Sequence, residues 1–115
     1  MEIVVRRYRT LDGAEPFTQW LNGLTDPKAK ALVLVRIERL AFGTFGDARP
    51  LREGVLELRI DYGPGYRVYF GREGAMAVLL LCGSDKRRQD KEIKRAIDLW
   101  REYRSRRSRE SVANR

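Results

Sequence analysis

Histidine is absent from this chain of 115 residues, and cysteine occurs once, at position 82. Catalysis by imidazole is therefore excluded, and no set of cysteine and histidine ligands is available to hold zinc. No compact acidic motif indicates a divalent ion, so we predict neither a metal nor another cofactor. The lone Cys82 lies in an apolar segment, where we expect a small buried side chain in a protein from a reducing compartment.

Long apolar runs are also missing. No segment reaches the roughly 20 apolar residues of a membrane-spanning helix, and residues 1–5 lack the layout of a signal peptide. We therefore expect a cytoplasmic protein that does not associate with membranes. Its hydrophobic content of 43% and charged content of 35% are ordinary for a soluble globular protein, and the length allows one domain with its own core.

The net charge of +8 is unevenly spread along the chain. Residues 101–115 carry six arginines and two glutamates, so half of the excess lies in this last segment. A basic excess suits a polyanion and an acidic protein partner equally well. Residues 104–115 have no apolar stripe and are predicted to be a disordered basic tail, which leaves residues 1–103 as a single domain.

Hydrophobic spacing predicts two helices after an opening strand over residues 3–9. In residues 16–24 apolar side chains recur at helical spacing. Asp26 and Pro27 combine a capping carboxylate with a proline in the first turn of a second helix, which Gly43 ends. We expect these helices to form a helical hairpin. Residues 43–54, rich in glycine, proline and charge, should form a connection with at most a short strand.

The segment that follows carries the pattern of three consecutive antiparallel strands. Residues 56–61 and 66–70 alternate between apolar and polar side chains, whereas residues 75–82 are apolar throughout and should be covered on both faces. From about residue 87 to residue 103 the apolar period is again that of a helix. The expected fold is therefore α+β: a helical hairpin packed on a twisted, mainly antiparallel sheet, with a C-terminal helix.

The alternation also predicts how the first two of these strands pair. Opposed residues of a hairpin share a face, so apolar residues must oppose apolar residues across a turn with an odd number of residues. Two arginines and a tyrosine then share the other face. The predicted pairs are Ile60 with Val68 and Leu58 with Phe70 on the core face, and Asp61 with Arg67 and Arg59 with Tyr69 on the other.

Arginine, lysine and tyrosine without histidine suit phosphodiester chemistry better than acyl transfer. When RNA is cleaved, its 2′-hydroxyl attacks phosphorus in line, and negative charge builds on oxygens that Arg59 and Arg67 can stabilise. Lys86, in the loop after the third strand, is the candidate for proton transfer, and Tyr69 is the candidate for stacking on a base. The alternative is that the arginines form ordinary ion pairs on a solvated face: Arg67 with Asp61, and Arg59 with Glu57.

Arg87 and Arg88 open the last helix, where their charge opposes the helix dipole. An external anion would compensate them, which makes both candidates for binding a phosphate. Asp90 and Glu92 already supply a local compensation, so a structural role stays open as well.

Four segments of the chain resemble one known family. FTQWLNGL, the DPKAKA helix start, GDARPLREGVLELRIDYGPGYRVYF and VLLLCGSDKRRQDKEIKRA are very similar to small bacterial toxins of type II toxin–antitoxin modules. The resemblance is to the HigB-like group of addiction module killer proteins within the RelE/ParE superfamily. It covers residues 1 to about 103 and implies the same helical hairpin on a mainly antiparallel sheet.

The resemblance also implies a function. RelE-type toxins are ribosome-dependent endoribonucleases that cut mRNA in the ribosomal A site with basic residues on an open sheet face. Carried over to this chain, the catalytic residues would be Arg59, Arg67 and Lys86, with Arg87 or Arg88 beside them. The implied partner is a small helix-turn-helix antitoxin, through which the toxin would meet operator DNA only indirectly.

The chain departs from the family pattern at two places. Glu57 stands where RelE-type toxins often carry a lysine, and Gln89 and Asp90 occupy the region where some members have a tyrosine. A general acid or base is therefore not carried over, although Asp90 stays a candidate for contact with the substrate. Two other functions stay open: a ParE-like inhibitor of DNA gyrase without enzyme activity, which the retained cations disfavour, and a degenerate toxin that only binds its antitoxin.

Overall fold

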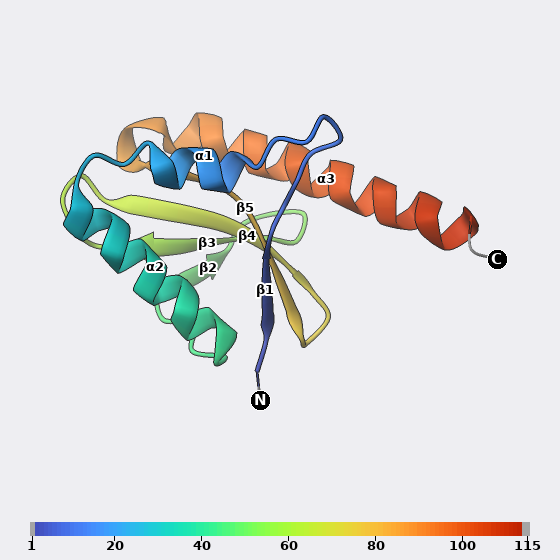
Figure 1. The fold of residues 1–115 in the computed structure, drawn as a ribbon, viewed down its shortest axis with the longest axis horizontal. Coiled ribbons are helices and arrows are strands. Elements are labelled where there is room, and N and C mark those ends of the chain that lie inside the picture. Colours follow the sequence, from blue (N-terminus) through green and yellow to red (C-terminus); the bar gives the residue numbers. More distant parts are fainter. Residues whose placement is uncertain (1, 114–115) are drawn as a thin grey trace.

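The computed structural model describes residues 2–113 of the chain. It is an α+β fold in three layers, in which a mixed five-stranded sheet lies between two N-terminal helices and a long C-terminal helix (Figure 1). The predicted fold class, the mainly antiparallel sheet and the C-terminal helix are confirmed. Within residues 2–113, no helix combines the length and the apolar character needed to cross a membrane.

Five strands make the sheet: β1 (Val4–Arg7), β2 (Ala48–Pro50), β3 (Val55–Ile60), β4 (Tyr66–Glu73) and β5 (Ala77–Asp85). Their order is β1-β5-β4-β3-β2, in which β1 runs parallel to β5 and all other neighbours are antiparallel. β2 is the short strand predicted within residues 43–54. β5 is covered on both faces, as its apolar run predicts, because Leu80 faces one core cluster and Leu81 the other.

The helices are α1 (Pro16–Asn22), α2 (Pro27–Ala41) and α3 (Gln89–Ala113), and a short 3₁₀ helix, η1 (Lys86–Arg88), leads into α3. Asp26 caps α2 as predicted, since its carboxylate accepts a hydrogen bond of 2.9 Å from the backbone N–H of Lys28. The cap and the proline beside it explain why α2 begins at this point in the chain.

The predicted helical hairpin is not evident. α1 lies mainly against β5, whereas α2 contacts β1 and β3 (Figure 1). The buried side chains of both helices, among them Phe17 and Leu21 of α1 and Val33 and Leu40 of α2, point into one cluster on the sheet. The hairpin prediction was wrong because each helix has a single apolar stripe, and the sheet covers both stripes.

The turn between β3 and β4 closes one residue earlier than predicted. Ile60 opposes Tyr66, so Arg59 lies directly opposite Arg67. The four predicted pairs are therefore wrong by two positions, although the odd-numbered turn and the assignment of faces are right. Gly65 adopts a φ of 82°, a left-handed conformation that glycine accepts without strain, and this allows the early closure.

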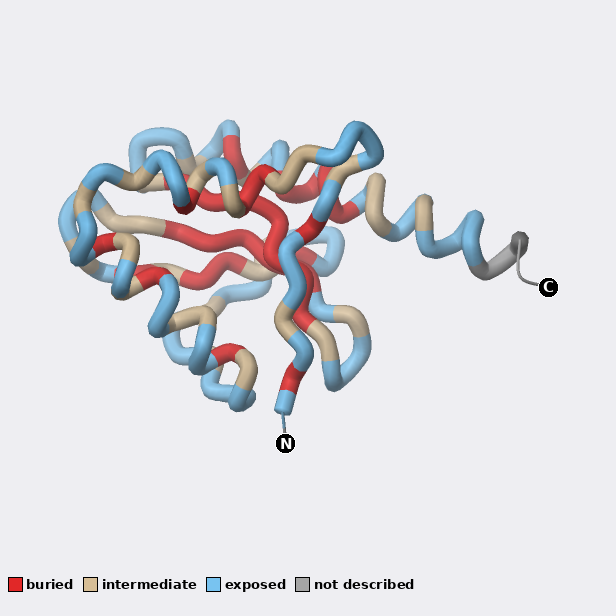
Figure 2. The backbone as a smooth tube through the Cα atoms, viewed as in Figure 1, coloured by how far each residue is buried: buried red, intermediate tan, exposed pale blue. Residues whose placement is uncertain are grey.

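The sheet face that carries Arg59 and Arg67 is largely covered, not solvated. α3 packs on it and forms a second core cluster that includes Tyr69, Leu81 and Cys82, and Figure 2 shows buried strands lying between the helices. Cys82 is fully buried, as predicted, and burial raises the pKa of its thiol to about 12. Period-two alternation separates the two faces of a strand, but it does not reveal that a later helix covers the second face.

The predicted disordered tail is helical as far as the structure describes it. α3 continues through residues 104–113, and the rest of the predicted tail, residues 114–115, lies outside the described residues. Arg106 donates a hydrogen bond of 2.7 Å to the carbonyl of Arg9, and Arg107 pairs with Glu73 at 2.9 Å. Extending a helix costs little once a docked segment has nucleated it, and these contacts hold the first part of the extension against the body, beyond which the helix projects away (Figure 1).

Both tryptophans rest on glycines of the central strands. A Cβ atom at Gly71 of β4 would lie 2.3 Å from the ring of Trp100, and one at Gly83 of β5 would lie 2.2 Å from the ring of Trp20. Any side chain at either position would displace a ring. Trp100 is buried, and Trp20 is half-buried at the edge of the other core cluster.

Candidate functional site

A cavity of about 510 Å³ opens beside the turn that joins β3 to β4. Arg59 from β3, Arg67 from β4 and Lys86 from η1 all line it, although the chain separates them. Two carboxylates, Asp47 and Asp61, line it as well. We call this space the arginine cavity. The structure thus brings the three predicted cations to one place.

Arg67 forms the inner wall of the arginine cavity. Its side chain is buried, and its Nη1 donates a hydrogen bond of 3.1 Å to the carbonyl of Gly65. That carbonyl also accepts a bond of 3.0 Å from the backbone N–H of Lys86, which ties the start of η1 to the β3–β4 turn. The buried Nε of Arg67 has no hydrogen-bond partner in the described part of the chain. Arg67 therefore keeps a donor that its surroundings do not satisfy.

Glu57 stands between the two arginines. Its carboxylate oxygens lie 3.8 Å from Nε of Arg59 and 3.7 Å from Nε of Arg67, and Gln89 of α3 donates a hydrogen bond of 3.0 Å to it. Glu57 is 3% exposed, so its carboxylate contacts the two guanidinium groups from the buried side. The carboxylate compensates the repulsion between two directly opposed cations. Of the predicted ion pairs, Arg59 with Glu57 occurs, and the pairing of Arg67 with Asp61 is wrong.

Tyr69 is not able to stack on a base. Its ring is fully buried beneath α3, and its hydroxyl shares a hydrogen bond of 3.0 Å with that of Ser84. Burial is the main reason that the pKa of Tyr69 lies well above the usual range. The proposed role in substrate binding was wrong because α3 closes the sheet face at this point.

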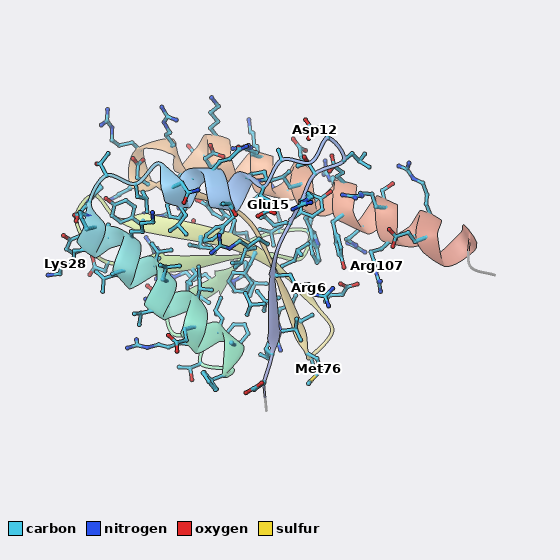
Figure 3. The ribbon with its side chains drawn as sticks, viewed as in Figure 1. Arg6, Asp12, Glu15, Lys28, Met76 and Arg107 are labelled. Carbon is cyan, nitrogen blue, oxygen red and sulfur yellow. The ribbon has the colours of Figure 1, made fainter. Side chains whose placement is uncertain are left out.

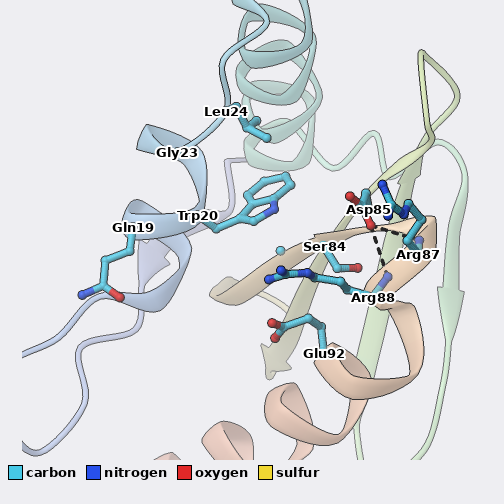
Figure 4. Close-up of a pocket in the computed structure, with 10 residues that line it drawn as sticks. Gln19, Trp20, Gly23, Leu24, Ser84, Asp85, Arg87, Arg88 and Glu92 are labelled. Atoms are coloured by element: carbon cyan, nitrogen blue, oxygen red, sulfur yellow. Dashed lines mark hydrogen bonds between the residues drawn. The ribbon is translucent and has the colours of Figure 1, made fainter.

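Arg87 and Arg88 lie at a second cavity, of about 540 Å³, between α1 and the start of α3. Figure 4 shows Trp20 reaching into it from α1, opposite Arg88 and Glu92. We call this space the tryptophan cavity. The structure therefore separates these two arginines from the three cations of the arginine cavity, and exposed Asp90 lines neither space.

The start of the C-terminal helix is capped from within the chain. Asp85 accepts hydrogen bonds of 2.9 Å and 3.1 Å from the backbone N–H groups of Arg87 and Arg88 (Figure 4). This cap satisfies donors that would otherwise face an external anion. The side chains of both arginines remain exposed and available.

The groups that line the arginine cavity can bind a phosphate and can transfer protons to and from the oxygens that react at it. Arg59 is half-buried and Lys86 is exposed, so both reach solvent, while Arg67 lies behind them. Guanidinium groups fixed by a buried carboxylate are suited to binding the oxygens of a phosphodiester. The exposed groups of the lining that can accept or donate a proton are Asp47, Asp61 and Lys86.

Fold and site together define a class: a small α+β protein whose mixed sheet holds a cluster of cations at one end. No family model matches the chain. A protein of Haemophilus influenzae, described as an uncharacterized protein, is 51% identical over 80 residues, which make up 70% of this chain and 81% of that protein. The chain belongs to the same family as this Haemophilus protein.

Sequence patterns present Glu57 only as an alternative ion-pair partner of Arg59, and they do not identify Gln89 as part of the site. Glu57 alternates with apolar residues as any solvated residue of a half-buried strand would. Only the packing of α3 on the sheet buries it and brings Gln89 within hydrogen-bond distance. A weak indication was available, since a glutamate two residues before an arginine on one strand face is well placed to pair with it.

Proposed function

We propose that this protein is the toxin of a type II toxin–antitoxin module, acting in the cytoplasm, and that it cleaves mRNA in the ribosomal A site. The observation that carries the proposal is the convergence of Arg59, Arg67 and Lys86 on the arginine cavity. The sequence similarity to HigB-like members of the RelE/ParE superfamily supports it. The absence of histidine from the chain leaves these cations as the groups best suited to phosphodiester chemistry.

In this reaction the 2′-hydroxyl oxygen of one nucleotide attacks the adjoining phosphorus, and the bond from phosphorus to the 5′-oxygen breaks. The products are a 2′,3′-cyclic phosphate and a 5′-hydroxyl. Arg59 and Arg67 stabilise the charge that builds on the non-bridging oxygens. Asp61 takes the proton of the attacking hydroxyl, and Lys86 gives a proton to the leaving oxygen, so the step is balanced without a further reactant. Glu57, buried beneath the arginines, is a positioning residue.

The proposed protein partner is a helix-turn-helix antitoxin, which would link the toxin indirectly to operator DNA. A basic groove between β1 and α3 suits an acidic segment of such a partner. Arg6 of β1 and Arg107 of α3 line a common groove there, and Figure 3 shows both on the same side of the molecule. Arg7, Arg9 and Arg106 line the same groove. Charge complementarity of this kind speeds association and selects partners.

Inhibition of DNA gyrase without enzyme activity is the second candidate, and a toxin that only binds its antitoxin is the third. Neither requires cations in the arginine cavity. The ion pairs from Glu57 to both arginines favour a site that is held ready for an anion. Gyrase-dependent DNA breaks in cells that express the protein would favour the second candidate, and normal growth on expression would favour the third.

The test is cleavage of a defined mRNA on programmed ribosomes by the purified protein, with the 5′ ends of the products mapped. Arg59→Ala and Lys86→Ala should each slow cleavage by roughly 100-fold, the usual effect of removing one group that stabilises transition-state charge or one that transfers a proton. Both side chains reach solvent, so the variants should remain folded.

The matched control is Lys94→Ala, because Lys94 is an exposed cation of α3 that lines neither described cavity. This variant removes one positive charge outside the site, and it should cleave the mRNA at the rate of the unmodified protein. Absence of cleavage by the unmodified protein, or equal rates for all three variants, would contradict the proposed function.

A further inference from the structure

We propose that the tryptophan cavity is a subsite for a guanine base. The biological role of this subsite rests on the proposed cleavage of RNA, because a guanine bound here would belong to the strand that is cut. Its binding chemistry is independent of that activity. The residues that carry the proposal are Trp20, Arg88 and Glu92.

The size and walls of the cavity suit a nucleotide. Its volume of about 540 Å³ falls within the range of small-molecule sites. Trp20 is held in place because its ring lies against Gly83 and makes an edge contact with Tyr66, with ring centres 6.4 Å apart. It is half-buried, so part of the indole still faces the cavity (Figure 4). Proteins that read single-stranded RNA hold unstacked bases against aromatic side chains fixed in this way.

One carboxylate oxygen of Glu92 is buried without a hydrogen-bond donor in the described residues. The residue is 9% exposed, and its Oε2 is buried with no hydrogen-bond partner in residues 2–113. The nearest cation, Nη1 of Arg95, lies 3.8 Å from that oxygen, beyond hydrogen-bond distance. Burying an acceptor without a donor is costly, so each such group in a folded protein calls for an explanation. A ligand that donates hydrogen bonds would supply one.

The chemistry of the two charged groups selects guanine. A carboxylate only accepts hydrogen bonds, and guanine alone among the four RNA bases presents two adjacent donors, N1–H and the 2-amino group, on its pairing edge. Arg88 precedes Glu92 by one helical turn, and its side chain extends into the same cavity (Figure 4). A guanidinium prefers O6 and N7 of guanine, so Arg88 and Glu92 complement different atoms of one base.

The two cavities adjoin each other. Lys86 lines the arginine cavity, and the next residue, Arg87, lines the tryptophan cavity. Tyr66 lines the arginine cavity, and its ring contacts Trp20 in the other. A strand whose phosphate lies in the first cavity can therefore place a nearby base in the second. The guanine subsite would select where along the RNA the cut falls.

Binding is tested on the unmodified protein by two-dimensional NMR of the two indole N–H groups. GMP should shift the signal of Trp20 and leave that of Trp100, which is buried on the opposite face of the sheet. GMP should bind at least about tenfold more tightly than AMP, CMP or UMP, the discrimination expected of one bidentate contact.

Three variants identify the contact. Glu92→Gln should lower the affinity for GMP by about tenfold and remove its advantage over the other nucleotides, because the amide replaces one acceptor with a donor. Arg88→Ala, at an exposed residue, should weaken GMP more than UMP. Asp98→Asn is the matched control, since this exposed carboxylate of α3 lines neither cavity and should leave binding unchanged.

Equal binding of all four nucleotides, an unmoved Trp20 signal, or full GMP preference in Glu92→Gln would each overturn the subsite. The result is separable from the proposed function. GMP preference in a protein that does not cleave mRNA would support the subsite and overturn the nuclease. Cleavage of mRNA without a preference for GMP would support the nuclease and overturn the subsite.

Discussion

At the scale of single residues, the buried carboxylate of Glu57 organises the arginine cavity. Two arginines directly opposite each other on neighbouring strands would repel, and Arg67 is almost fully buried. Glu57 lies within 4 Å of both guanidinium groups and is itself held by Gln89. A buried charge is tolerated only when it is paired, so the buried pair Glu57 and Arg67 depend on each other.

Glu57→Ala should lower the free energy of unfolding by about 3–5 kcal/mol, because Arg67 would keep a buried charge without its counter-ion. Urea denaturation measures the effect. Glu38→Ala, at an exposed glutamate of α2, is the control and should change stability by less than about 0.5 kcal/mol. Similar unfolding midpoints for the two variants would show that Glu57 does not stabilise the cluster.

At the scale of elements, the position of α3 depends on the fit between its tryptophan and the sheet. Trp100 lies against Gly71, at a distance that leaves no room for a Cβ atom. The hydroxyl of Tyr103 donates to Glu73, and that of Tyr8 donates to Glu102, so hydrogen bonds hold the helix beyond the tryptophan. The helix therefore docks in one register, which is the register that brings Gln89 to Glu57.

Gly71→Ala should destabilise the protein by about 1–3 kcal/mol, the usual cost of inserting a methyl group into a packed core. Thermal unfolding gives the change in stability. The control is Gly23→Ala: Gly23 has a φ of −81°, and a Cβ there would come no closer than 3.4 Å to its neighbours. Equal stability of the two variants would mean that Trp100 moves aside without cost.

At the scale of the whole molecule, two core clusters share one sheet. α1 and α2 cover the first face and α3 covers the second, so the central residues of β4 and β5 are buried (Figure 2). Several phenol groups and the single thiol take part in this packing or in hydrogen bonds to carboxylates. Their pKa values are raised: Tyr8, Tyr62, Tyr69, Tyr103 and Cys82.

Stability should therefore fall in alkaline solution. Burial and the hydrogen bond to Glu73 raise the pKa of Tyr103 from 10.0 to about 12, and burial raises that of Cys82 from 9.0 to about 12. The folded protein holds these protons more tightly than the unfolded chain does. Their contribution is complete below about pH 9 and is lost as the pH rises towards 12.

Thermal midpoints measured at increasing pH check this expectation. Tyr103→Phe removes one of the titrating groups, so its midpoint should fall less steeply with pH than that of the unmodified protein. Parallel curves for the two proteins would show that the phenol of Tyr103 does not contribute to the alkaline loss.

Helices and strands were predictable to the extent that their causes are local. Asp26 and Pro27 begin α2, and the alternation in residues 56–61 separates the two faces of β3, because caps and strand periodicity depend on neighbouring residues. The candidate cations were predictable as residue types on one face. Their surroundings were not, since burial of Tyr69 and the contact from Gln89 come from a helix that follows the sheet in the chain.

The sequence alone determined the order of elements, the faces of the strands and the shortage of catalytic groups other than cations and carboxylates. Only the tertiary structure decided that Arg59 lies opposite Arg67 with Glu57 close to both, and that α3 covers Tyr69. It also decided that Arg87 and Arg88 line a separate cavity with Trp20. The physical reason is the distance along the chain over which each kind of interaction acts. Backbone conformation and amphipathic spacing act over a few residues, whereas register and burial are fixed by contacts between segments far apart in the chain.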